Sequence, residues 1–280
     1  MAKHIPFIHN YCDRWCERCC FTASCAIFED DKAGGQEAQD IKNKAFWDRI
    51  AKNFEKAHAL LVEGALKHGI DLNAIPQEEL DAIGEQNEKN MQKTKDDDLV
   101  KLCVEYTKRS HNFMLNESLW KQKADEMIEQ EKLGTLGIQE LEDQLRLMKE
   151  CREIIQWYEF FIEMKFIRAV SGLNEDYRFE DDEETRYQTD YNGSAKIALI
   201  ALDRSQLAWT QLFTVIPEED LIFPILSLLS RIEKAANEKF PDAKKFIRPG
   251  FDELERTEIP HDRATAKPGV FVEFQYGKRR

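Results

Sequence analysis

The sequence predicts an all-α fold: a multi-helix bundle preceded by a small N-terminal cysteine-rich metal-binding module. No proline lies between Pro76 and Pro217, and this interval is rich in the strong helix formers Glu, Lys, Gln, Leu and Ala. Five of the seven cysteines fall within residues 11–25. We therefore expect three parts: a cysteine-rich cluster-binding segment at 1–31, a helical bundle at 32–248 and an extended C-terminal tail at 249–280.

Composition limits the function. The chain has 280 residues, of which 42% are hydrophobic, enough for one large domain or two modest ones. Its formal charge of −13 repels phosphate backbones and anionic lipids, which argues against general nucleic-acid or membrane binding. The sequence shows neither a signal-peptide core nor an apolar run of roughly 20 residues. We expect a cytoplasmic protein.

Three helices are expected in the first half of the chain. The first runs from about Gln36 to Lys67 and carries an apolar stripe, and the second begins at Pro76 and is polar and exposed. The third runs from about Asp96 to Glu131, with apolar residues around much of its surface. The stripe of the first helix comprises Phe46, Trp47, Ile50, Phe54, Ala57, His58, Leu61 and Ala65.

Three more helices follow. The fourth covers about 138–170 and has a broad apolar face. An acidic stretch from Glu175 to Glu184 and a loop lead to a fifth helix, which we expect to start near Ser194. The sixth opens at Pro217, whose following acidic residues suit a helix N-terminus, and Pro224 is expected to kink it or shift its start.

The cysteine spacing is the strongest functional signal. Cys12, Cys16, Cys19 and Cys25 follow a C-x3-C-x2-C-x5-C pattern, and in a reducing compartment such thiols indicate a metal site rather than disulfides. Four thiolates suit either a [4Fe-4S] cluster or zinc. Structural zinc sites usually separate two short ligand pairs by a longer loop, so the compact spacing favours the cluster.

Other side chains near these cysteines have open roles. Cys20 is expected to be spare, either as a replacement for Cys19 or as a redox-sensitive thiol. His4 and His9 are close enough to replace a cysteine ligand. The neighbouring aromatic residues either shield a cluster or attach the segment to the bundle; they are Phe7, Tyr11, Trp15, Phe21 and Phe28.

Residues 16–25, CERCCFTASC, resemble the C-x2-C-x5-C part of the iron-staple motif of Cas4-like and AddB-like nucleases. The resemblance implies a [4Fe-4S] site with Cys12 as the remaining ligand, but not a nuclease. Cys12-x3-Cys16-x2-Cys19 also has the radical-SAM spacing, although Arg18 replaces the usual aromatic residue and the chain lacks alternating strands. The whole phrase HIPFIHNYCDRWCERCCFTASC looks like the opening of an uncharacterised bacterial cysteine-rich family, which implies no activity.

The helical part offers weaker candidates. Glu55 and His58 have the E-x-x-H spacing of di-metal carboxylate bundles, but no second copy occurs, so His58 is better interpreted as a histidine on an apolar stripe. Glu159 and Glu163 fall on a strip expected to face solvent. Ser110 and Glu117 lie near the apolar side of the third helix, and Asp203 lies in an apolar stretch; with His58, these residues leave a second site open. Cys103 and Cys151 are expected to be buried small hydrophobic residues.

The leading hypothesis is a [4Fe-4S] protein with a redox, electron-transfer or structural cluster on Cys12, Cys16, Cys19 and Cys25, working with an unidentified redox or protein partner. The alternative is a zinc-stabilised helical interaction module. A third possibility is a helical metal-dependent oxidoreductase. The sequence leaves open whether the chain is an enzyme, since no phosphate-binding loop, nucleophile elbow, zinc-protease motif or dinucleotide fingerprint is present.

Overall fold

A computed structural model describes residues 4–35, 37, 40–72, 74–175 and 187–252. This part of the chain contains eight α-helices and no strand, which confirms the all-α prediction. The helices are α1 (Ala26–Gly34), α2 (Lys44–Lys67), α3 (Gln77–Asp96), α4 (Asp98–Met114), α5 (Glu117–Lys132), α6 (Ile138–Asn174), α7 (Asp190–Val215) and α8 (Glu219–Lys239). Short 3-10 turns lie at Ile8–Asn10 (η1), Cys16–Arg18 (η2), Thr22–Ser24 (η3) and Ala243–Lys245 (η5).

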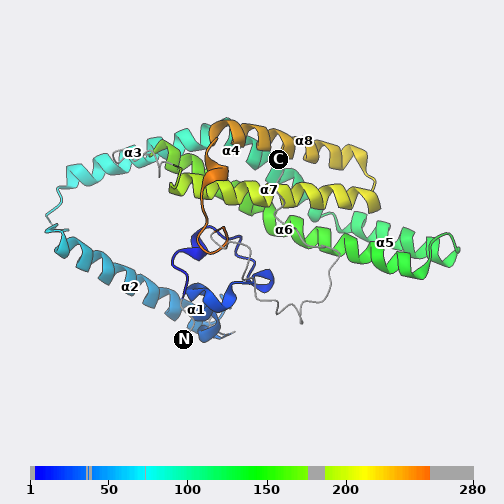
Figure 1. Cartoon of the computed structure of the whole chain (residues 1–280), viewed down its shortest axis with the longest axis horizontal. Helices are drawn as coiled ribbons and strands as arrows, with labels where there is room; N and C mark the ends of the chain where they lie inside the picture. Colours follow the sequence, from blue (N-terminus) through cyan, green and yellow to red (C-terminus); the bar gives the residue numbers. More distant parts are fainter. Residues whose placement is uncertain (1–3, 36, 38–39, 73, 176–186, 253–280) are drawn as a thin grey trace.

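The core of the bundle lies where α4, α6, α7 and α8 pack together (Figure 1). Ile155 and Phe166 of α6 meet Leu202 and Trp209 of α7 in this core, and all four side chains are fully buried. Burying each such apolar side chain contributes roughly 1.5–3 kcal/mol. Cys103 and Cys151 are also fully buried in this core, as the sequence predicted.

Several helix ends differ from the predictions. The third predicted helix is two helices, α4 and α5, because the Asn116 side chain accepts a hydrogen bond from the Leu119 amide and so caps a new helix. The fifth predicted helix begins at Asp190 rather than near Ser194, because Thr189 caps it through the Asn192 amide. The first predicted helix begins at Lys44, where Asn43 is the cap.

The apolar stripe of α2 is not buried against the bundle, contrary to the usual expectation for such a stripe. Trp47 is 55% exposed and Phe54 is 72% exposed, and only Ala65 in this helix is buried. Together α2 and α3 form an open V that projects from the rest of the molecule, with the connection between the two helices at its tip (Figure 1). We call this V the arm.

The N-terminal segment lies beside the bundle, close to the end of the described chain (Figure 1). The acidic stretch lies mostly outside the described residues, as do residues 253–280 of the predicted extended tail. The described start of that tail forms a turn around Gly250, whose φ of +75° favours glycine. Pro224 lies inside α8, which continues through it. In the described part of the chain, no helix is both long and apolar enough to cross a membrane.

Candidate metal centre

The four predicted ligands lie around one small cavity. Cys12, Cys16, Cys19 and Cys25 all line it, whereas Cys20 is exposed and does not. The remaining lining residues are Ile8, His9, Asp13, Arg14, Trp15, Phe21, Thr22, Phe28 and Phe251. The cavity thus groups four of the five N-terminal thiols and leaves Cys20 outside it.

Tight turns bring the thiols together. Cys16 starts η2 and Cys19 follows it, while Cys25 ends η3 and directly precedes α1. Between the first two cysteines, Arg14 adopts a left-handed φ of 61°, a conformation that costs energy for a residue other than glycine. The backbone thus adopts an unfavourable conformation at Arg14, between Cys12 and Cys16.

Two of the four sulfur atoms, those of Cys12 and Cys19, form hydrogen bonds with the backbone. The Phe21 amide donates to Cys19 Sγ at 3.4 Å, and Cys12 Sγ donates to the His9 carbonyl at 3.6 Å. Amide donors of this kind stabilise negative charge on a ligating sulfur. The Cys19 sulfur is therefore positioned to act as a thiolate when a cation is bound.

Burial raises the pKa values of these thiols. Desolvation raises the pKa of Cys12 and of Cys16, and it raises that of Cys19 to about 11 despite the Phe21 amide. Arg14 opposes the shift at Cys12 and Cys16. Without a cation these thiols are neutral near pH 7, so binding a metal here requires their protons to leave.

Asp13 anchors the thiol segment to the bundle. Its carboxylate accepts hydrogen bonds from the Tyr158 hydroxyl at 2.7 Å and from the Arg204 guanidinium. Its backbone carbonyl accepts a hydrogen bond from Trp157 Nε1 at 3.0 Å. Tyr158 is buried, so this is the point at which residues next to Cys12 contact the interior of the bundle.

An aromatic stack continues from the cavity toward the surface. Trp15 lines the cavity and stacks on Trp157 of α6, with ring centroids 4.8 Å apart and planes 18° apart. Arg18 lies over the Trp15 ring, 3.9 Å from its centroid, and forms an ion pair with Glu153. Trp157 is 37% exposed, so the stack reaches solvent.

Tyr11 forms a second attachment to α7. Its hydroxyl donates to Asp190 at 3.0 Å, and its ring meets that of Phe246 edge-on at 4.6 Å. The ring also lies against Gly193, where an added Cβ would be only 2.4 Å from Tyr11 Cε1. A glycine at position 193 is therefore needed for this close approach. Of the five aromatic residues considered from the sequence, Tyr11 and Trp15 attach the segment to the bundle, and Trp15, Phe21 and Phe28 line the cavity. Phe7 is exposed.

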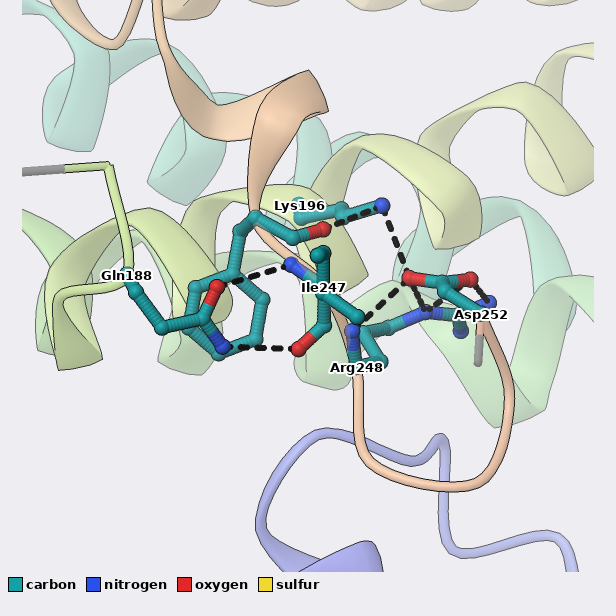
Figure 2. Close-up of polar contacts among 6 residues, drawn as sticks. Gln188, Lys196, Ile247, Arg248 and Asp252 are labelled. Atoms are coloured by element: carbon teal, nitrogen blue, oxygen red, sulfur yellow. Dashed lines mark hydrogen bonds and ion pairs between the residues drawn. The ribbon is translucent and has the colours of Figure 1, made fainter. Parts of the chain in front are cut away.

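Residues near the end of the described chain also contribute to the cavity, through Phe251. Figure 2 shows the Gln188 side chain pairing with the backbone of Ile247, donating to its carbonyl at 2.8 Å and accepting from its amide at 3.0 Å. Lys196 bonds both to the Phe246 carbonyl and to Asp252. These contacts hold the loop over the thiol segment.

Within this loop, Arg248 forms a two-pronged ion pair with Asp252 and is almost fully buried (Figure 2). Phe251 follows from the same turn, lines the cavity and packs edge-on against Phe21 at 4.8 Å. Nothing in the cysteine spacing indicated this contribution from a residue more than 200 positions away.

The weaker sequence candidates do not form a second site around His58. This side chain and Glu55 are both exposed on α2, and Asp203 is exposed on α7. Glu117 is exposed and forms an ion pair with Arg152. These residues lie on three different helices, α2, α5 and α7.

Glu159 is a correction to the predicted solvated strip, because it is only 3% exposed. Its carboxylate accepts from the Ser110 hydroxyl at 3.0 Å and contacts His111 Nδ1 at 3.0 Å, and its backbone carbonyl accepts from Thr107. Ser110 thus has the buried polar role that the sequence suggested. At this position of α6 a polar side chain does not face water, because Ser110 and His111 of α4 supply partners for the buried carboxylate.

Among the described residues, no group of three or more His, Cys, Asp or Glu side chains is arranged to hold a metal ion, and this includes the four thiols that line the cavity. Comparison with protein-family models, with curated proteins and with solved structures finds no match to this chain. The assignment of a bound metal ion or cluster therefore rests on the four thiols and the residues around them.

Proposed function

We propose that this chain is an iron–sulfur protein and that Cys12, Cys16, Cys19 and Cys25 bind a [4Fe-4S] cluster. The observation that carries the proposal is that these four thiols share one cavity while Cys20, next to one of them, lies outside it. Four thiolates are the usual ligand set of a cubane cluster. Their compact spacing further favours the cluster.

The surroundings suit an anionic group. Arg14 lies close enough to lower the pKa of Cys12 and Cys16, and Lys165 interacts electrostatically with Cys12 and donates to the Asn10 carbonyl at 3.3 Å. Positive charge and amide donors near the sulfurs stabilise a cluster that carries net negative charge, and aromatic walls limit access of water and oxidants. Phe21, Phe28 and Phe251 provide those walls.

Two roles follow from the same contacts. Ile8 is the only buried residue in the described part of the segment up to Cys25, so the segment has little apolar core of its own and gains internal cross-links from a bound cluster. The Trp15–Trp157 stack gives the cluster an aromatic connection to the surface, which favours electron transfer. Because four cysteines complete the coordination, substrate binding at iron is disfavoured.

Zinc is the second candidate, and the size of the cavity favours it. The cavity volume is about 20 Å³, close to the space that one water molecule occupies. A single ion fits this space once the thiols turn toward one point, whereas a cluster requires them to move apart. A zinc site would make the segment an interaction module without redox chemistry.

Anaerobic purification with visible absorption and analysis of iron, sulfide and zinc tests the proposal. We expect a brown protein with about four iron and four sulfide per chain, whose absorption falls on reduction with dithionite. A colourless protein with one zinc per chain and no iron would instead establish the zinc module.

Single Cys→Ser variants test the ligand set. Changing Cys12, Cys16, Cys19 or Cys25 is expected to remove most of the bound iron, whereas Cys20→Ser retains it. Cys20 is the matched control because it adjoins a proposed ligand but is exposed. Loss of iron in Cys20→Ser together with retention in Cys19→Ser would show that the proposed ligand assignment is wrong.

A further inference from the structure

The arm carries an apolar surface that the bundle does not cover. On α2, Trp47, Phe54 and Leu61 are spaced by seven residues and therefore lie on one side of the helix; they are 55%, 72% and 59% exposed. An exposed contiguous apolar stripe of this kind is typical of an interaction surface.

The second helix of the arm has a matching stripe. Leu80, Ile83 and Met91 lie on one side of α3, and each is about half exposed. Thr94, farther along the same side, is buried where α3 joins the bundle. The two helices thus present two apolar stripes that do not cover each other.

Both ends of the arm are attached, which holds the V open. At the start of α2, Arg49 forms an ion pair with Asp31 of α1 at 2.8 Å. At the end of α3, Thr94 accepts a hydrogen bond from Asn174 of α6 at 3.2 Å. Closing the V would require breaking one of these attachments, so its stripes remain available to another molecule.

The charges of the two helices are complementary. Helix α2 has five basic and three acidic side chains, a net charge of +2, with the excess in residues 44–56. Helix α3 has six acidic and three basic side chains, a net charge of −3, and its acidic half is residues 77–88. Parallel packing of α2 on α3 brings the basic half of one against the acidic half of the other.

Antiparallel packing has the opposite effect, since it brings the basic half of α2 against Lys89, Lys93 and Lys95 of α3. A hairpin within one chain must be antiparallel. The connection of nine residues between the helices contains hydrogen-bonded turns, such as that from the Ile70 amide to the Ala65 carbonyl at 2.8 Å. It is too compact for α3 to return along the whole length of α2, about 36 Å, and pack parallel to it.

We propose that two copies of this chain interlock through their arms, with α2 of each copy packed parallel to α3 of the other. A two-fold axis near the middle of the overlapping arms generates both contacts at once, because the tip of each arm then reaches the base of the other and the outgoing α2 of one copy runs in the same direction as the returning α3 of its partner. Each contact joins two apolar stripes and pairs opposite charges. The proposal does not depend on what the thiols bind.

Analytical ultracentrifugation of the full-length chain across a range of concentrations tests whether this dimer forms. We expect a dimer that Phe54→Asp weakens by at least about tenfold, because an aspartate replaces a large apolar side chain in each contact. Leu66→Asp is the matched control: Leu66 is also 72% exposed on α2 but lies away from the stripe, so the dimer should persist. Circular dichroism confirms that each variant remains helical.

Mixing variants tests which helices meet. Phe54→Asp and Ile83→Asp should each be largely monomeric alone, yet a mixture should form heterodimers, because the intact α2 of one can pack on the intact α3 of the other. A monomeric wild-type chain at the highest soluble concentration would overturn the proposal. So would a dimer that Phe54→Asp leaves unchanged, or a dimer that Ile83→Asp leaves intact, since the latter indicates pairing between α2 helices alone.

Discussion

The hydroxyl of Tyr158 donates a 2.7 Å hydrogen bond to the carboxylate of Asp13, a residue 145 positions earlier that directly follows Cys12. Arg204 bonds to both groups, so two helices of the bundle hold the turn between the first two thiols. The geometry of the thiol cavity thus depends on residues of α6 and α7.

Replacing Asp13 by Ala should therefore loosen this turn. Because Tyr158 is buried and loses its acceptor, we expect the free energy of unfolding to fall by about 1–3 kcal/mol, with reduced metal retention. Urea denaturation and metal analysis measure these effects. Asp30→Ala is the control, because Asp30 is an exposed residue of α1. Equal stability of the two variants would show that the Asp13 contacts contribute nothing measurable.

Gly193→Ala should displace Tyr11. The new Cβ would be 2.4 Å from Tyr11 Cε1 and 2.7 Å from Phe246 Cζ, so at least one ring must move. We expect a loss of about 1–3 kcal/mol in thermal or urea unfolding. Gly64→Ala in α2 is the control, because a Cβ there meets nothing within 4 Å and alanine favours a helix. A fully stable Gly193→Ala protein would contradict the close packing described for Tyr11.

The ion pair between Asp252 and Arg248 is expected to weaken in acid. Burial alone would raise its pKa, but hydrogen bonds from Arg248 and Lys196 outweigh burial and lower the pKa from 3.8 to about 2. A carboxylate with a depressed pKa stabilises the fold fully above its unfolded-state pKa and loses that contribution as the pH falls through the folded-state value.

Wild type should thus be more stable than Asp252→Asn at neutral pH, and the difference should shrink between about pH 4 and pH 2. Thermal unfolding of both proteins over this range measures it. Asp98→Asn serves as a control because Asp98 is exposed at the start of α4. A difference between wild type and Asp252→Asn that stays constant down to pH 2 would argue against the ion pair with Arg248.

Glu159→Ala should destabilise the bundle by about 2 kcal/mol, since the buried Ser110 hydroxyl and the half-exposed His111 ring both lose their carboxylate partner. Glu163→Ala, one turn later and only half-buried, is the comparison. Urea unfolding distinguishes them. Similar small effects for both would show that the contacts of Glu159 with Ser110 and His111 contribute little to stability.

The sequence by itself predicted the long helices of the bundle, although not α1, and it singled out the four cysteines that line the cavity. Local preferences suffice for these features: helix formers without proline specify long helices, and spacings of two to five residues keep thiols within one compact turn region. Helix ends were less predictable because a single capping side chain, such as that of Asn116, can divide one apolar pattern into two helices.

Only the tertiary structure decided what covers each surface. Periodicity shows that one side of a helix is apolar, but it does not identify the element that packs there, so the stripe containing Phe54 is exposed although its pattern resembles that of a core helix. In the same way, Glu159 is buried because Ser110 and His111 approach it from α4, and Phe251 reaches the thiols from the other end of the chain. Such contacts join residues far apart in sequence, and local preferences do not contain them.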